Sequence, residues 1–143
     1  MGNDRMGIAR TVAAVSGVVF LLVGVIGFIP AISPQADSVQ GMEVADAAVI
    51  GLVPVNAIAN IVHLLFGGIL LYGATRTSLA IAVLRGLGFV YLLLAAIGLF
   101  APEGFGILPL GGGELFVHIA TALVFLGVGF LFADRADDVR TAV

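Results

Sequence analysis

Four long runs of apolar residues dominate the chain, and short stretches rich in glycine, proline, serine, threonine or acidic residues separate them. The runs cover residues 11–32, 47–72, 79–100 and 115–132. Each approaches or exceeds the roughly 20 apolar residues that a helix needs to cross about 30 Å of hydrocarbon. The pattern predicts an all-α fold, an integral membrane four-transmembrane-helix bundle that forms a single membrane domain over residues 1–143.

Composition agrees with this pattern and excludes other classes of protein. Hydrophobic residues make up 61% of the chain and charged residues 10%, and the mean hydropathy is +1.21. A soluble domain of this length cannot bury that much apolar surface. The formal net charge of −3 and the scattered basic residues provide no groove for nucleic acid. The partner that composition predicts is therefore the lipid bilayer.

The cationic residues outside the apolar runs lie before the first run, between the second and the third, and after the fourth, so they occupy alternate connections. All six cationic residues of the chain are arginines, and cationic residues stay on the cytoplasmic side during insertion. We therefore expect a multi-pass plasma-membrane protein with cytoplasmic N and C termini and a short charged cytoplasmic tail, residues 133–143. The arginines outside the runs are Arg5, Arg10, Arg76, Arg135 and Arg140, and the arginine-free connections carry Asp37, Glu43, Asp46, Glu103 and Glu114.

The first run has a second interpretation as a cleavable signal peptide, because Arg5 and Arg10 precede it as a basic region does. The run is longer than the usual apolar region of about 7 to 15 residues. Pro34 also follows the best small-residue cleavage site and should block cleavage. A membrane helix is the favoured interpretation.

Arg85 is the one charged residue inside a predicted span. It lies six residues after Leu79, so its long side chain can reach the cytoplasmic interface while its stem stays in hydrocarbon. We expect an interfacial anchor. Pairing with the acidic tail residues Asp134, Asp137 or Asp138 is compatible with that role.

Two segments of the chain resemble each other. Residues 17–30 aligned on residues 88–101 share six identical positions, and Val62-His63 corresponds to Val117-His118. The alignment indicates a two-plus-two repeat. Because each half crosses the membrane twice, the halves would be related by an axis along the membrane normal.

Polar residues form a stripe on each of two spans. Asn56, Asn60 and His63 share one helical face, and Glu114, His118 and Thr121 repeat the same spacing. Such groups avoid lipid, so both stripes should point into the bundle or at water. Interhelical hydrogen bonding is the favoured interpretation. A metal site, a haem site or a proton relay is the alternative.

Two features of the sequence count against cofactor binding. Bis-histidine haem needs both ligands at similar depth, yet His118 lies near the start of its span and His63 about 16 residues into a span that begins at Ala47. The objection weakens if that helix begins at Pro54, a favoured first helical position. A zinc or copper site would need a further ligand, for which Glu114 is the candidate. We therefore predict no cofactor and no metal.

Enzymatic activity is not expected. The chain has no cysteine, no serine nucleophile motif and no acidic residue at mid-membrane depth. Its many glycines favour close helix packing or self-association. The apolar connection 104–110 is expected to cap the bundle at the interface, with partner docking as the alternative.

Three strings resemble one family. They are GFIP at residues 27–30, VNAIANIVHLLFG at 55–67 and ILPLGGGELFVH at 107–118, and together they resemble the small four-helix membrane proteins of the domain of unknown function 4383 family. In the second helix, the residues that resemble the family pattern are Asn56, Asn60, His63 and Leu64. Ala59 stands where the family usually has a further histidine, which weakens any shared metal or haem site here.

The sequence therefore favours a structural or accessory subunit of a membrane complex, or a homo-oligomer. A cofactor-binding or proton-relay protein that uses His63 and His118 is the second hypothesis. A small-molecule transporter, formed as an oligomer, is the third.

Overall fold

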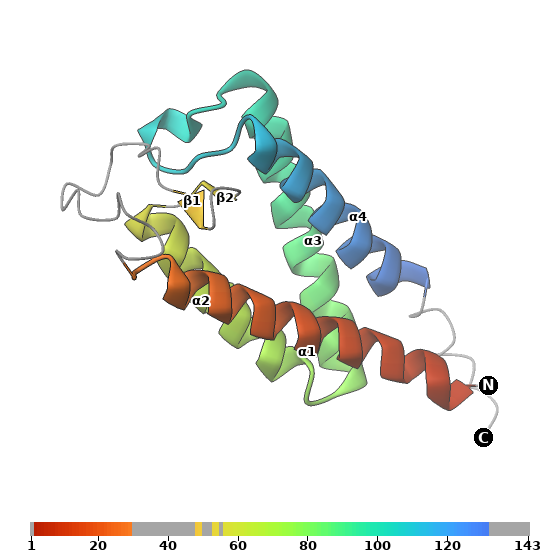
Figure 1. The fold of residues 1–143 in the computed structure, drawn as a ribbon. Coiled ribbons are helices and arrows are strands. Elements are labelled where there is room, and N and C mark those ends of the chain that lie inside the picture. Colours follow the sequence, from red (N-terminus) through yellow and green to blue (C-terminus); the bar gives the residue numbers. More distant parts are fainter. Residues whose placement is uncertain (1, 30–47, 50–52, 55, 132–143) are drawn as a thin grey trace.

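The computed structural model describes residues 2–29, 48–49, 53–54 and 56–131. This part of the chain forms four α-helices, a short 3-10 turn and one very small antiparallel hairpin (Figure 1). The predicted helical fold is confirmed. The elements are α1 (Gly2–Ile26), β1 (Ala48–Val49), β2 (Val53–Pro54), α2 (Ala57–Gly73), α3 (Thr77–Phe100), η1 (Gly104–Gly106) and α4 (Gly113–Leu131).

Three of the described helices are long and apolar enough to span a membrane. These are α1 from Gly7 onward, α3 and α4. Helix α2 is equally apolar but has 17 residues, which at 1.5 Å per residue gives about 26 Å of helix. It therefore lies at the lower limit of length for a membrane-spanning helix.

The predicted helical span from residue 47 is wrong at its start. Residues 48–49 and 53–54 pair as antiparallel strands, with Ala48 opposite Pro54 and Val49 opposite Val53, and α2 begins only at Ala57. A short apolar run is compatible with strand and helix alike, so composition alone did not separate them. Asn56 starts the helix, because its side-chain oxygen accepts a hydrogen bond from the Ala59 N–H at 2.7 Å.

The other boundaries also differ from the apolar runs. Helix α1 ends at Ile26, short of the predicted end at residue 32, and a turn follows in which the Ile29 N–H donates to the Ile26 carbonyl. Residues 30–32, the whole connection 33–46 and the tail 133–143 lie outside the described residues. The turn predicted over residues 73–78 is present but shorter, because α2 ends at Gly73 and α3 begins at Thr77.

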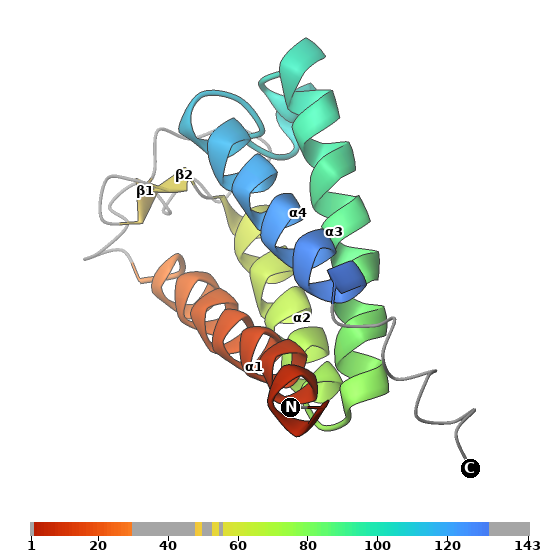
Figure 2. The ribbon, with the colours of Figure 1, turned by 90° about the vertical axis from the view of Figure 1, so that its right-hand side faces the viewer.

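The four helices pack as two close pairs, α1 with α2 and α3 with α4, while α1 and α4 touch little (Figures 1 and 2). Glycines allow the close approach within each pair. A Cβ on Gly17 of α1 would lie 2.9 Å from Leu71 Cγ of α2, and a Cβ on Gly88 of α3 would lie 2.8 Å from Leu126 Cγ of α4. These contacts leave no room for a larger side chain.

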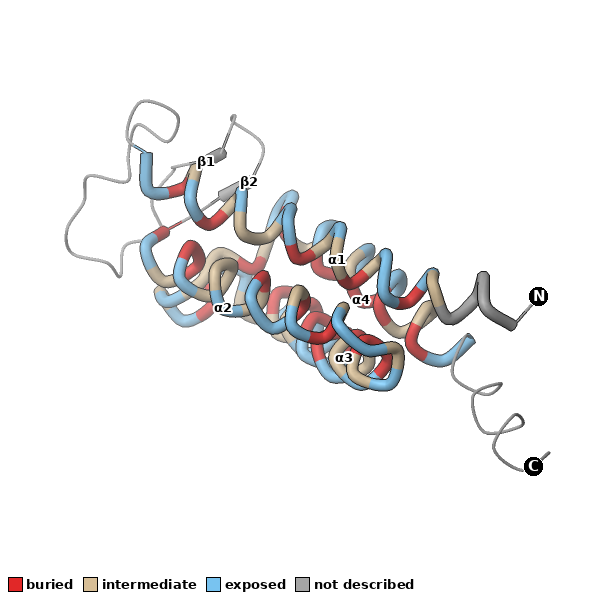
Figure 3. Tube along the Cα trace, turned by 90° about the horizontal axis from the view of Figure 1, so that it is seen from below, coloured by how far each residue is buried: buried red, intermediate tan, exposed pale blue. Residues whose placement is uncertain are grey.

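The interior contains a few large side chains among many small ones. Leu70, Leu84 and Phe125 are fully or almost fully buried, together with several alanines. Large apolar side chains are exposed on the outward faces of all four helices, and the buried positions turn inward (Figure 3). An outward apolar surface of this kind suits a hydrocarbon solvent.

Arg85 is bound at the end of the bundle where α4 finishes. Its Nε donates to the Gly129 carbonyl at 2.9 Å, and its guanidinium carbon lies 4.4 Å from the centre of the Phe130 ring. The suggested tail partners Asp134, Asp137 and Asp138 lie outside the described residues. The described contacts show that a helix-terminal carbonyl and an aromatic face hold this cation.

Candidate functional site

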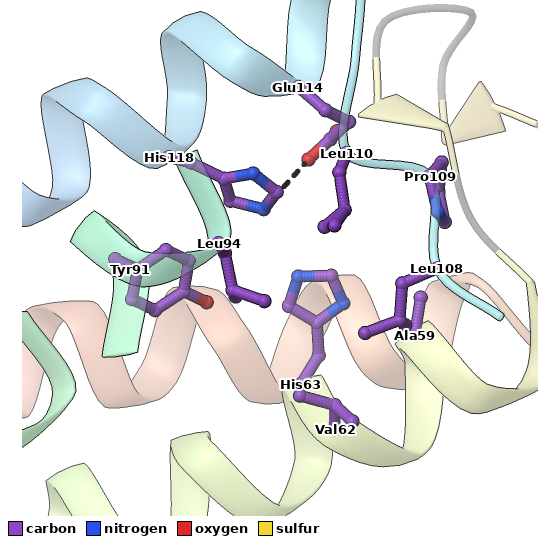
Figure 4. Close-up of a pocket in the computed structure, with 10 residues that line it drawn as sticks. All are labelled: Ala59, Val62, His63, Tyr91, Leu94, Leu108, Pro109, Leu110, Glu114 and His118. Carbon is purple, nitrogen blue, oxygen red and sulfur yellow. Dashed lines mark ion pairs between the residues drawn. The ribbon is translucent and has the colours of Figure 1, made fainter. Parts of the chain in front are cut away.

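Four polar side chains from three helices line one cavity in the half of the bundle next to the hairpin (Figure 4). His63 comes from α2, Tyr91 from α3, and Glu114 and His118 from α4. Leu108, Pro109 and Leu110, from the connection between α3 and α4, cover the end of this space. The connection thus closes the cavity at the end of the bundle.

The two histidines lie at similar depth, contrary to the expectation from the apolar runs. His63 is seven residues into α2, which begins at Ala57, and His118 is six residues into α4, which begins at Gly113. The expectation was wrong because it started the second helix at residue 47. With the correct start, both imidazoles reach the same cavity (Figure 4).

Aromatic rings form a continuous cluster beside this cavity. The ring centres of Tyr91 and His118 are 5.5 Å apart, those of Phe20 and His63 are 5.4 Å apart, and Phe20 meets Tyr91 at 5.8 Å. Each imidazole is therefore held against an aromatic neighbour, and Phe20 of α1 links the two sides. These contacts fix the ring positions without using the polar ring nitrogens.

The polar atoms of the cavity are poorly paired. The closest polar contact joins His118 Nε2 to Glu114 Oε2 at 3.5 Å, within α4, which is longer than a good hydrogen bond. Within the described part of the chain, His63 Nδ1, His118 Nδ1 and Glu114 Oε1 are buried without a hydrogen-bond partner. A buried polar group without a partner costs about 1 to 3 kcal/mol. Three polar atoms of the residues that line the cavity thus lack a protein partner.

The cavity has two lobes that share His63, Tyr91, Glu114 and His118. The inner lobe, under Leu108–Leu110, has a volume of about 30 Å³, enough for about two water molecules. The outer lobe has a volume of about 200 Å³ and extends between α1 and α4. Its further lining residues are Val19, Phe20, Val23, Val117 and Thr121.

The two polar stripes contribute unequally to the site. His63, Glu114, His118 and Thr121 all line the cavity. Asn60 is almost fully buried and lies against Gly27 of α1, outside the lining of both lobes.

Asn56 also stays outside the cavity lining and has a structural contact instead. Besides capping α2, its Nδ2 donates to the Ile107 carbonyl at 2.8 Å. It therefore connects the start of α2 to the connection that covers the cavity.

Comparison with known proteins assigns the chain to a family. The family model with the description Domain of unknown function (DUF4383) matches residues 10–131. The chain belongs to the DUF4383 family. The match covers α2, α3 and α4 completely and α1 from Arg10, so it includes every residue of the cavity, and it confirms the resemblance seen in the sequence. No curated protein and no solved structure matches the chain significantly.

Tyr91 is the site residue of this DUF4383 protein that sequence reasoning missed. It is 4% exposed and lines both lobes, but on an apolar helix a single tyrosine resembles an ordinary core residue. The internal alignment held a signal, because Phe20 and Tyr91 occupy the same position in residues 17–30 and 88–101. These two aligned aromatic residues contact each other in the fold.

The arrangement limits which cofactors fit. Among residues 2–29, 48–49, 53–54 and 56–131, no three His, Asp or Glu side chains come together as metal ligands. Ala59, which stands where the resemblance places a histidine in other DUF4383 proteins, lines the inner lobe and adds no donor. The imidazoles already pack against Tyr91 and Phe20, so a porphyrin between them would have to displace these rings.

Proposed function

We propose that this DUF4383 protein binds a small molecule reversibly inside the membrane, in the cavity lined by His63, Tyr91, Glu114 and His118, and that it is not an enzyme. The observation that supports this role is the convergence of four polar side chains from three helices on one space, with three buried polar atoms unpaired. A bound molecule with its own donors and acceptors would satisfy these atoms.

The cost of leaving buried polar atoms unpaired is larger than the gain from an interhelical hydrogen bond, and this difference favours ligand binding over a purely structural role for the cavity residues. Interhelical hydrogen bonds in membrane proteins contribute about 0.6 kcal/mol on average. Three unpaired buried atoms at about 1 to 3 kcal/mol each cost several times that amount. Outside the cavity, Asn56 pairs with the Ile107 carbonyl, whereas the Oδ1 of Asn60 is also buried without a partner. The convergence of the cavity residues on one space, rather than the unpaired atoms alone, therefore supports binding.

Native mass spectrometry of protein purified in a mild detergent tests this proposal. We expect a bound molecule on the wild-type protein at a stoichiometry near one, and its loss from His118→Leu. Thr75→Val is the matched control, because it removes an exposed hydrogen bond to the Tyr72 carbonyl far from the cavity and should keep the bound molecule. Wild-type protein that carries no small molecule, or a His118→Leu variant that elutes as wild type and keeps the molecule, would overturn the proposal.

A structural role through self-association is the second candidate. Gly68 of α2, Gly86 of α3 and Gly127 of α4 have open space where a Cβ would lie, and small surface residues let a further membrane helix approach closely. We propose these faces as contacts with a second copy or another membrane subunit. Light scattering in detergent tests this role, and a monomeric wild-type protein from mild detergent would exclude self-association.

The orientation that we propose places both termini in the cytoplasm of a plasma-membrane protein. The arginines in the described residues gather at one end of the bundle, where Arg10 donates to the Ala74 carbonyl, Arg76 starts α3 and Arg85 binds the Gly129 carbonyl. Glu103 and Glu114 lie toward the opposite end. A reporter enzyme fused to the C terminus should be active only in the cytoplasm, and activity outside the cell would reverse the orientation.

We also propose that the chain contains two equivalent halves. Gly17 packs on Leu71 within the α1–α2 pair as its aligned partner Gly88 packs on Leu126 within the α3–α4 pair. His63 and His118 occupy corresponding positions and face one cavity between the halves. Separately expressed halves, residues 1–75 and 76–143, should therefore associate when they are made in the same membrane, and failure to co-purify would contradict the proposal.

A further inference from the structure

The outer lobe of the cavity has an apolar rim on the surface of the bundle. Val19 of α1 is 50% exposed and Val117 of α4 is 44% exposed, and both line the lobe. Helices α1 and α4 pack mainly against their own partners, so little contact closes the space between them. At this depth the exposed surface would face acyl chains. A molecule dissolved in lipid can therefore reach the polar residues without crossing the water interface.

The size of the lobe restricts what can enter. Its volume is about 200 Å³, whereas a cavity of about 150 Å³ holds one benzene ring and drug-sized ligands occupy about 300 to 1,000 Å³. The lobe thus accepts a single substituted six-membered ring. Any longer part of the molecule must leave through the apolar rim, which suits a hydrocarbon tail.

The lining indicates the chemistry of that ring. Four rings surround the lobe, from Phe20, His63, Tyr91 and His118, and flat side chains favour a flat guest. His63 and His118 reach the space from α2 and α4, on two walls of the cavity (Figure 4). Each neutral imidazole offers one N–H donor, and the Tyr91 hydroxyl offers another.

Charged head groups suit this lining less well than neutral ones. Glu114 would repel an anionic head such as a phosphate or carboxylate, and the residues that line the described lobes include no arginine. A quaternary amine would be attracted by Glu114 and the aromatic faces, but it would leave the donors of the imidazoles and the hydroxyl without acceptors. A neutral ring with two carbonyl oxygens on opposite sides uses donors from both walls.

We propose that the bound molecule is a quinone with an isoprenoid tail, whose ring lies in the outer lobe between His63 and His118 and whose tail leaves between α1 and α4. This inference rests on the proposed binding function and names the chemical class of the ligand. The ring carbonyls accept hydrogen bonds from the two imidazoles or from the Tyr91 hydroxyl. The tail lies against Val19 and Val117.

Calorimetric titration of the detergent-solubilised protein with a ubiquinone that carries two isoprenoid units tests the inference. We expect saturable binding of one quinone per chain. Geraniol, which has the same tail without the ring, should bind at least tenfold more weakly because it lacks both carbonyls. The benzoquinone ring without a tail should also bind more weakly, because it loses the contacts at the rim.

Variants separate the parts of the site. His118→Phe keeps a flat ring but removes its N–H and should weaken quinone binding at least tenfold, whereas Val117→Trp should block the rim without touching the polar residues. Thr75→Val should bind quinone as wild type does. If His118→Phe fails to elute as a folded species, His63→Phe provides the same measurement from α2.

The outcomes distinguish this inference from the proposed function. Equal affinity for the quinone and for geraniol, or quinone affinity unchanged in both Val117→Trp and a folded histidine variant, would overturn the quinone assignment. If mass spectrometry still finds a molecule that depends on His118, the binding function stands and the ligand belongs to another chemical class. If neither measurement finds binding, both proposals fall.

Discussion

Replacing Asn56 by alanine should remove the hydrogen bond that joins the start of α2 to the connection that covers the cavity. The Asn56 side chain is 7% exposed and makes two hydrogen bonds of opposite direction. Its oxygen accepts from the Ala59 N–H at 2.7 Å, and its nitrogen donates to the Ile107 carbonyl at 2.8 Å. Alanine removes both bonds at once.

The magnitude follows from the two bonds. Loss of a helix N-cap costs about 1 kcal/mol, and loss of one intramolecular hydrogen bond costs about 1 kcal/mol more. Asn56→Ala should therefore lower the free energy of unfolding by about 2 kcal/mol, a factor of about 30 in the ratio of folded to unfolded protein. Asn56→Ser keeps a capping oxygen but is too short to replace the bond to the Ile107 carbonyl, so it should cost about half as much.

Unfolding by sodium dodecyl sulfate in mixed micelles, followed by far-ultraviolet circular dichroism, measures these differences. Thr75→Val is the control, since the bond from Thr75 Oγ1 to the Tyr72 carbonyl is exposed and its loss should shift the midpoint little. An Asn56→Ala variant as stable as the wild type would refute the reasoning. So would an Asn56→Ser variant as unstable as Asn56→Ala, because the cap would then contribute nothing.

Three further predictions concern helix packing, the half-buried Arg85 and access to the cavity. Gly98→Ala should destabilise the protein by about 1 to 3 kcal/mol in the same unfolding assay, because its Cβ meets a backbone carbonyl. Gly86→Ala, also in α3 but facing open space, should be neutral or stabilising by up to about 1 kcal/mol. Arg85→Lys should lower the free energy of unfolding by about 1 kcal/mol, because lysine keeps the charge but not the planar stacking on the Phe130 ring. An unfolding midpoint equal to that of the wild type would contradict this prediction. Thr121→Cys should react with N-ethylmaleimide in detergent far faster than Ala122→Cys, because Thr121 lines the outer lobe whereas Ala122 is 1% exposed. The natural chain has no cysteine that would react as well. Equal rates for the two variants would contradict an open outer lobe.

The helical fold was predictable because apolar length is a strong signal, whereas the start of α2 was not. Residues 47–55 are as apolar as the helix that follows, and hydrophobicity alone does not separate a strand from a helix over so short a run. The decisive local signal was Asn56, a preferred N-cap residue directly before Ala57. A helix start assigned from the N-cap residue Asn56, rather than from the first apolar residue, predicts that His63 and His118 lie at similar depth in the membrane.

The candidate site was only partly visible in the sequence for a related reason. The spacing of His63, Glu114 and His118 identified inward-facing polar residues, and the structure brings these three together. Tyr91 joins them only because α3 also packs against α1 and α2 of the other pair, and spacing within one helix carries no information about those neighbours. Arg85 was predictable as a residue that needs support, but its partner, the Gly129 carbonyl, depends on how α4 ends beside it.

The most direct measurement of the central claim is an experimental density map of the protein purified from its native membrane in a mild detergent. The account predicts a flat feature beyond the protein atoms in the outer lobe, within hydrogen-bonding distance of His63 or His118, with an extension that leaves between α1 and α4. A map in which the imidazoles and Glu114 hydrogen-bond directly to one another across a closed bundle would contradict it.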